Sequence, residues 1–231
     1  MSREARWDGL ASLYDAGMAP LERWPVRAWR DRVRRQLQQA LERRRTGGRS
    51  AGRAGRPPRV LEVGAGTGRN RLPEELEARV VAVDRSLDML RRARRRGYRT
   101  AVVADVGALP FPDDAFAAGA ETLVWCEVER PVEALAEVRR VLAAGARFVM
   151  LDHVRPPGLL GPVADVLSRV TGPWMDEWWN RDTRRYVEPA GFGLLRSRDD
   201  LGGAVRTLLL EKTPEDGAAD DETEPTTEER R

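Results

Sequence analysis

The sequence predicts a doubly wound α/β fold in one domain that covers residues 59–212. Short apolar runs of strand length alternate along this stretch with segments whose apolar residues recur at helical spacing. A glycine-rich turn follows the first run, where the chain would pass from a strand into a helix. The last two runs are joined by a turn with aspartate and two glycines, which is typical of a β-hairpin. These three observations predict a parallel sheet that ends in an antiparallel pair.

Seven runs have the length and composition of β-strands, namely residues 59–63, 80–83, 101–104, 118–124, 147–152, 193–198 and 204–211. Helices are expected over residues 7–18, 21–44, about 70–78, 86–95 and 131–142. Because parallel strands are joined only by crossover connections, the alternation predicts right-handed βα units. The expected architecture is a Rossmann-like seven-stranded sheet with a C-terminal antiparallel hairpin.

Charge is distributed unevenly along the chain. The net charge is +3, but residues 1–59 carry 15 arginines and 6 acidic residues, whereas residues 213–231 carry 8 acidic residues and 2 arginines. The stretch between them is near neutral, so no nucleic-acid partner is expected. The expected regions are a helical cap at 1–44, a flexible linker at 45–58, the α/β domain at 59–212 with a lid-like insertion at about 158–180, and a disordered acidic tail at 213–231.

The composition indicates where in the cell the protein is expected and which disulfide or metal sites it can form. No apolar run has the length of a membrane span, and the arginine-rich N-terminus lacks the apolar core of a secretory signal, so we expect a cytoplasmic protein. A single cysteine, Cys126, excludes an internal disulfide. With a single histidine, His153, a metal site built from Cys and His is not expected.

The helix expected at 21–44 has two interpretations. Its residues Trp29, Val33, Leu37 and Leu41 recur every fourth position, and arginines occupy the other faces. We favour a cap helix that packs on the domain. The alternative is a basic amphipathic helix that makes peripheral contact with an anionic membrane surface.

The strongest functional signal is the sequence VLEVGAGTGRN at residues 60–70, which places a glycine-rich turn between a strand and a helix. In open α/β sheets ligands bind beyond the carboxyl ends of the strands, so a nucleotide-like cofactor is expected at this turn. Acidic residues at strand ends strengthen this prediction. Asp84 can accept hydrogen bonds from ribose hydroxyls, Asp105 can accept from an exocyclic amine, and Glu62 needs a cationic or donor partner because it is buried.

Two other interpretations of the glycine-rich turn are open. It can be a purely structural tight turn. It can also bind a dinucleotide, but a dehydrogenase needs Gly-x-Gly-x-x-Gly, and Arg69 stands where the third glycine would be. No candidate for hydride-transfer machinery stands out, so this second alternative is weaker.

Residues 59–212 resemble class I S-adenosylmethionine (SAM)-dependent methyltransferases, most closely the small-molecule group that methylates ubiquinone or menaquinone, phospholipids and thiols. The resemblance is carried by VLEVGAGTGRN, VVAVDRSLDML, ADVGALPFPDDAFAAGAETLVWCEV, EVRRVLAAGARFVMLDHVRPP and NRDTRRYVEPAGF. The sequence departs from the usual pattern at 116–117, at 144–146, and at Trp178 and Trp179, where a Cys-His pair is common. The last departure puts the substrate class in doubt.

The resemblance implies SAM as the cofactor and a role for each matching residue. By this resemblance, the methionine portion of SAM is surrounded by Glu62, Gly64, Ala65 and Gly66, and the sulfonium faces Leu123 to Trp125. The ribose is held by Asp84, and the adenine lies beside Arg85 and is contacted by Asp105 and Val106. The resemblance also implies that Tyr14 covers the cofactor.

Fewer residues indicate how the methyl acceptor would be bound. His153 is the one side chain with an ordinary pKa near neutrality, so it is a candidate general base or substrate anchor, with a structural role as the alternative. Trp125, Trp178 and Trp179 are candidate substrate contacts. The apolar segment 158–179 is either core packing or a lid over an apolar acceptor. The expected activity is methyl transfer to a small acceptor that is a lipid, quinone-like molecule, thiol or amine; the alternative is a catalytically silent SAM-binding regulatory or partner protein.

Overall fold

The computed structural model describes residues 15–16, 20, 25–47, 56–175 and 178–213. All but residues 15 and 16 of the predicted helix at 7–18, residues 48–55 of the predicted linker, and all but the first residue of the predicted acidic tail therefore lie outside the described residues.

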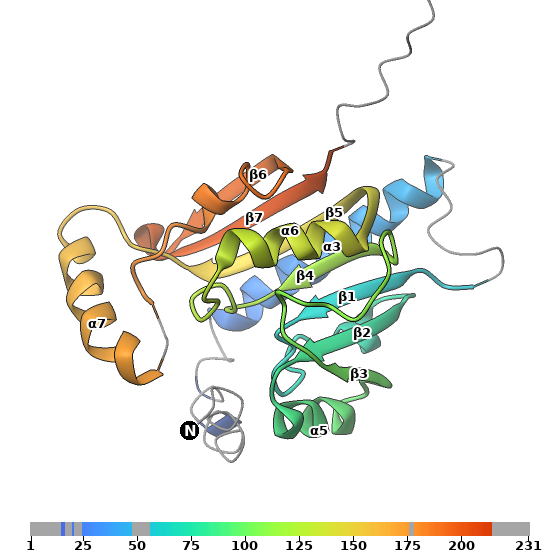
Figure 1. Ribbon diagram of the computed structural model, residues 1–231, viewed down its shortest axis with the longest axis horizontal. Helices are drawn as coiled ribbons and strands as arrows, with labels where there is room; N and C mark the ends of the chain where they lie inside the picture. The colour runs from blue at the N-terminus through green and yellow to red at the C-terminus, as the bar shows by residue number, and fades with distance from the viewer. Residues whose placement is uncertain (1–14, 17–19, 21–24, 48–55, 176–177, 214–231) are drawn as a thin grey trace, which may run out of the picture.

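A seven-stranded sheet forms the centre of the molecule, in the order β3-β2-β1-β4-β5-β7-β6 (Figure 1). The strands are β1 (Arg59–Val63), β2 (Arg79–Asp84), β3 (Thr100–Val103), β4 (Phe116–Glu121), β5 (Leu142–His153), β6 (Phe192–Asp200) and β7 (Val205–Lys212). The pairs among β1 to β5 are parallel, whereas β7 pairs antiparallel with both β5 and β6. This arrangement confirms the predicted fold class, including the C-terminal hairpin.

Helices cover both faces of the sheet. The helices are α3 (Val26–Thr46), α4 (Leu72–Glu75), α5 (Leu87–Arg95), α6 (Pro131–Val141) and α7 (Leu160–Met175), with short 3-10 helices η1 (Thr183–Tyr186) and η2 (Leu201–Gly203). Side chains of α3, α4 and α5 share one buried cluster with the sheet, and those of α6 share the other. Helix α5 begins as predicted, since the Ser86 hydroxyl accepts the N–H of Met89.

Two strands differ from their predicted bounds by three residues or more at one end. β4 begins at Phe116 and ends at Glu121, although the apolar run continues to Val124. The chain leaves the sheet there because Leu123 has a φ of 60°, a left-handed conformation that ends the pleat. β5 begins at Leu142, five residues earlier than predicted, and its pairing with β4 shifts register between Phe116 and Ala118.

Helix α3 is part of the core. It packs across β4 and β5, and Trp29, Val33 and Leu37 are 8%, 0% and 0% exposed. These are the apolar residues on which the membrane-contact alternative rested. Since the sheet buries them, this face of α3 is not available to a membrane. Among the described helices, none has the length and apolar character that a bilayer-spanning helix requires.

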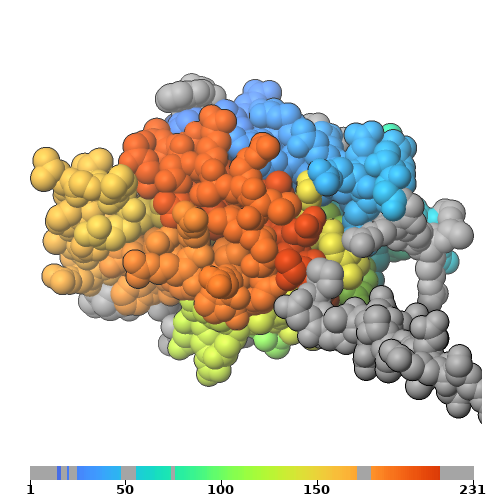
Figure 2. Space-filling model, turned by 90° about the horizontal axis from the view of Figure 1, so that it is seen from above, coloured from blue at the N-terminus to red at the C-terminus, as the bar shows by residue number. Residues whose placement is uncertain are grey.

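Helix α7 shows the reverse pattern. It stands apart from the sheet at one end of the molecule (Figures 1 and 2). Its small residues Gly161, Ala164 and Ser168 are buried. Over residues 160–170, where the side chains are described, the large apolar residues are exposed at 40–62% each, namely Leu160, Val163, Val166, Leu167 and Val170. An apolar helix face of this kind is unusual on a protein surface.

Because α3 packs into the core, truncating a side chain at its centre should lower the free energy of unfolding substantially. Leu37→Ala removes a fully buried side chain, so the free energy of unfolding should fall by about 2–5 kcal/mol in a urea titration. Gln39→Ala on the exposed face of the same helix is the control and should change it by less than about 0.5 kcal/mol. Equal, small effects would mean that α3 does not belong to the folded core.

Candidate functional site

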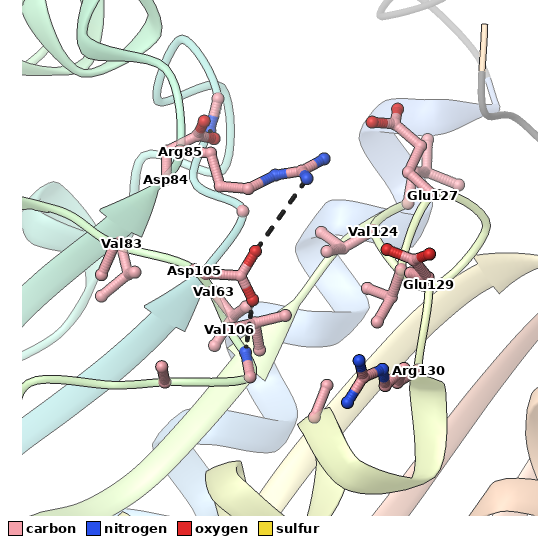
Figure 3. A pocket seen from close by; sticks show the side chains of 18 of the residues that line it. Val63, Val83, Asp84, Arg85, Asp105, Val106, Val124, Glu127, Glu129 and Arg130 are labelled. Carbon is pink, nitrogen blue, oxygen red and sulfur yellow. Dashed lines mark hydrogen bonds and ion pairs between the residues drawn. The ribbon is translucent and has the colours of Figure 1, made fainter. Parts of the chain in front are cut away.

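A cavity of about 620 Å³ lies beyond the carboxyl ends of β1, β2 and β4 and beside the start of α6 (Figure 3). Seven of the predicted cofactor residues line it: Gly64, Gly66, Asp84, Arg85, Asp105, Val106 and Leu123. Its opposite wall comes from the segment between β4 and α6, and includes Val124, Glu127, Glu129 and Arg130. The site is therefore built where the strand order reverses between β1 and β4, as open α/β sheets require.

The glycine-rich turn brings its backbone close to the cavity. Gly64 has a φ of 58°, and a Cβ at this position would overlap the side chain of Val124 across the cavity floor. Gly68 has a φ of 80° and packs on Ala93 and Tyr98, so a side chain there would collide with backbone. Only glycine satisfies both the backbone conformation and the close approach at these positions.

Asp84 links the two loops that border the cavity. Its Oδ2 accepts the N–H of Gly66 at 2.8 Å, and its Oδ1 accepts the N–H of Ser86 at 2.9 Å. Burial raises the pKa of Asp84, and the backbone hydrogen bonds from Ser86 and Gly66 oppose that rise. Each carboxylate oxygen still has a lone pair for another donor. A pair of ribose hydroxyls fits this acceptor set.

Asp105 is arranged differently. Its Oδ1 accepts the N–H of Gly107 at 2.7 Å, and its Oδ2 lies 4.0 Å from an Arg85 nitrogen (Figure 3). More than half of its side chain is exposed. The carboxylate thus lies at the rim of the cavity, beside Val106, where it can accept from a ligand amine.

Two residues predicted at the cofactor do not line the cavity. Ala65 is buried, and its N–H donates to the Val83 carbonyl at 3.0 Å, which ties the turn to β2. Glu62 lies behind the glycine-rich turn, fully buried, and its Oε1 accepts from Asn70 at 2.8 Å. Burial raises the pKa of Glu62 to about 7. Tyr14 lies outside the described residues.

The position of Trp125 differs from the prediction. Its side chain is fully buried, its indole N–H donates to the Pro131 carbonyl at 3.2 Å, and its ring packs on Phe148 at 6.1 Å. The turn at Leu123 directs this residue into the core beneath α6. Trp125 therefore supports the cavity wall and does not line the cavity.

His153, Trp178 and Trp179 come together on the other side of the segment that follows β4. The imidazole of His153 stacks on Trp179, with ring centroids 4.3 Å apart and an interplanar angle of 18°. The N–H of Trp178 donates to the Cys126 carbonyl at 3.1 Å. Arg181 donates to the carbonyls of Trp125 and Val128. Trp178 is thus bonded to the segment after β4, and His153, Trp178 and Trp179 do not line the cavity itself.

Asp15 is a site residue that the sequence analysis did not single out. Its Oδ1 accepts from Thr67 and Arg69, both at 2.8 Å, and its Oδ2 accepts from Arg96 at 3.0 Å. Burial raises the pKa of Asp15, but the hydrogen bonds from Arg96, Thr67 and Arg69 outweigh it and lower the pKa. Asp15 therefore ties the N-terminal segment to the glycine-rich turn and to α5. Its place directly after Tyr14 was the available signal.

Comparisons with known proteins match the same part of the chain. The family described as "Methyltransferase domain" matches residues 61–150. A demethylmenaquinone methyltransferase of Renibacterium salmoninarum is 38% identical over 112 residues, which are 48% of this chain and 46% of the relative. A phosphatidylethanolamine N-methyltransferase of Cereibacter sphaeroides is 32% identical over 135 residues, which are 55% of this chain and 65% of the relative. The chain spans about half the length of the first curated relatives it matches.

A solved structure shares the fold. Geranyl diphosphate C-methyltransferase from Streptomyces coelicolor, in complex with Mg²⁺, geranyl diphosphate and S-adenosyl-L-homocysteine, matches with a TM-score of 0.60. The match covers 78% of this chain and 78% of that chain at 15% sequence identity. At this identity the likeness concerns the fold alone.

The contacts of Asp15 predict a loss of cofactor affinity when they are removed. Asp15→Ala frees Thr67 and Arg69 in the glycine-rich turn, so calorimetry should show S-adenosylhomocysteine binding weakened about tenfold. Asp88→Ala is the control, because Asp88 forms an exposed ion pair with Arg91. A loss of affinity in Asp88→Ala as large as in Asp15→Ala would contradict this role.

The buried carboxyl of Glu62 predicts a stability that depends on pH. Its pKa is raised from 4.5 to about 7 in the folded protein, so folding takes up a proton between these values. The free energy of unfolding should therefore fall as pH rises through this window, by up to about 3 kcal/mol. Urea titrations at about pH 5 and about pH 8 should show a smaller fall for Glu62→Gln than for the wild type. The exposed Glu77→Gln should behave as the wild type, and identical slopes in all three proteins would refute the prediction.

Proposed function

We propose that this chain, whose residues 61–150 match a methyltransferase domain, is a class I SAM-dependent methyltransferase that transfers the methyl group of SAM to a small apolar acceptor. The observation that carries the proposal is the double hydrogen bonding of Asp84 beside the glycine-rich turn. This carboxylate is fixed by two backbone N–H groups and faces a cavity large enough for a nucleoside with its side chain.

The cavity residues fit the parts of the cofactor. Asp84 offers acceptors for ribose hydroxyls, Asp105 with Val106 offers an acceptor and an apolar contact for adenine, and Gly64 and Gly66 allow close approach of the backbone. When bound, SAM supplies an activated methyl group on a sulfonium. The task of the protein is then to align the acceptor and to exclude water.

We further propose that the acceptor approaches from the side of Trp178, Trp179 and His153. These residues are anchored to the segment after β4, whose inner side lines the cofactor cavity. The indole N–H of Trp179 is buried and has no acceptor among the described residues, so it is available to a ligand oxygen. His153, stacked on this ring, would orient it or take a proton from the acceptor.

An apolar acceptor is favoured by the surface nearby and by the relatives. The segment that ends at Trp178 follows α7, whose large apolar side chains are exposed. The two relatives described above carry the names of a menaquinone-pathway and a phospholipid methyltransferase. The rival function is a catalytically silent SAM-binding protein, which the departures from the family pattern at 116–117 and 144–146 keep open.

Turnover of labelled SAM with separate quinone, phospholipid, thiol and amine acceptors tests the proposal. Methyl transfer should appear with an apolar acceptor and should be lost in Asp84→Ala together with S-adenosylhomocysteine binding. Tight binding without transfer to any acceptor would favour the silent protein. Absence of binding to the wild type would overturn both functions.

Trp178→Ala separates the acceptor side from the cofactor side. The variant keeps the backbone N–H that bonds Cys126 but loses the half-exposed indole, so KM for the acceptor should rise about tenfold while S-adenosylhomocysteine affinity stays within about twofold. Leu195→Ala, which removes an exposed apolar side chain of β6, is the matched control and should leave both unchanged. Parallel loss of both affinities in Trp178→Ala would reject the acceptor role.

A further inference from the structure

Two carboxyl groups are buried side by side where β4 and β5 end. Glu121 is the last residue of β4 and is 0% exposed, and Asp152 is the penultimate residue of β5 and is 1% exposed. The two side chains meet at the same stretch of backbone, because Glu121 accepts the N–H of Leu151, the residue before Asp152, and the two acids accept the N–H groups of the consecutive residues Val124 and Trp125. Neither residue lines the cofactor cavity, and the proposed transfer does not use them.

Three of the four carboxyl oxygens of Glu121 and Asp152 accept a hydrogen bond from a backbone N–H. Glu121 accepts the N–H of Leu151 at 2.9 Å with Oε1 and the N–H of Val124 at 3.1 Å with Oε2. Asp152 accepts the N–H of Trp125 at 3.2 Å with Oδ1. Its Oδ2 is buried, and no N–H or hydroxyl among the described residues reaches it. Two ionised carboxylates in contact without solvent repel each other strongly, so one of them must hold a proton.

We propose that the carboxyl of Glu121 is protonated and donates a hydrogen bond to Asp152 Oδ2, and that this carboxyl pair positions the wall of the cofactor cavity. The two acids receive the N–H groups of Val124 and Trp125, which follow directly after Leu123. Leu123 is held at a φ of 60°, a left-handed conformation that is unfavourable for a leucine without outside support. Both Leu123 and Val124 line the cavity. Glu121 and Asp152 are thus positioning residues that act through the cavity wall.

Loss of the shared proton would loosen this wall. Burial and the charge of Asp152 raise the pKa of Glu121 well above its ordinary value. Burial raises the pKa of Asp152 to about 6, against an opposing effect of His153. Rising pH therefore places two negative charges beneath Val124 and Trp125, and cofactor affinity should fall. The other ionisable groups packed near the pair are Tyr186 of η1 and, beside Tyr186, Arg181 and Asp182.

Asp152→Asn replaces the shared proton with an amide N–H. The nitrogen of the introduced amide would donate to an ionised Glu121, and its oxygen would still accept from Trp125, so all donors and acceptors stay paired. Calorimetry should show that S-adenosylhomocysteine affinity of the wild type falls about tenfold from about pH 6 to about pH 9, whereas that of Asp152→Asn changes by less than about twofold. Asp152→Ala, which leaves Glu121 and Trp125 without their partner, should bind about tenfold more weakly at both values. A parallel fall in wild type and Asp152→Asn would overturn the proposal.

A second measurement does not depend on cofactor binding. The affinity test above rests on the proposed function, so this second measurement separates failure of the inference from failure of that function. The infrared band of a protonated carboxyl should be present in the ligand-free wild type at about pH 7 and weaker in both Glu121→Gln and Asp152→Asn. The band of Glu62 is common to all three proteins and cancels in the difference spectra. An unchanged band in both variants would show that the pair holds no proton. If the band behaves as expected but no protein binds S-adenosylhomocysteine, the proposed function fails and the proton assignment stands.

Discussion

The carboxylate of Asp84 is the constraint on which the rest of the site depends. It is the last residue of β2, yet it accepts N–H groups from the turn after β1 and from the start of α5. One buried charge therefore fixes the separation of two loops that leave neighbouring parallel strands. Asp15 performs the same task from outside, since it accepts from Thr67 of the turn and Arg96 after α5. The loops around the cavity are therefore held in place by acidic residues that accept hydrogen bonds from backbone N–H groups and from arginines.

The parts of the structure that the sequence predicted are those in which local pattern and global fold agree. Alternating strands and helices, the glycine-rich turn and acids at strand ends each limit the backbone to a few conformations, so the parallel sheet with its antiparallel hairpin and most residues along one side of the cavity could be predicted. Seven of the ten predicted cofactor residues line the cavity. Ala65 and Glu62 do not, because side chains alternate across a strand and through a tight turn, and the sequence does not show where the pleat ends.

Other features depend on tertiary contacts that no local pattern specifies. Trp125 is directed into the core by the left-handed backbone of Leu123, and the presence of a leucine does not predict that conformation. The stripe of Trp29, Val33 and Leu37 fits a sheet face and a membrane surface equally well, and only the position of β4 and β5 decides between them. The hydrogen bonds of Asp15 cross more than fifty positions in the chain and join groups that no spacing rule connects.

Helix α7 has a consequence for how the molecule loses its structure. Over residues 160–170, where its side chains are described, the large apolar ones are exposed, and polar contacts contribute to its attachment because Arg155 and Asn180 both bond Asp165. A helix attached in this way can melt as an independent cooperative unit, well below the free energy that opens the central strands. Heat or mild denaturant would then unfold α7 first and leave the central sheet and its cavity folded.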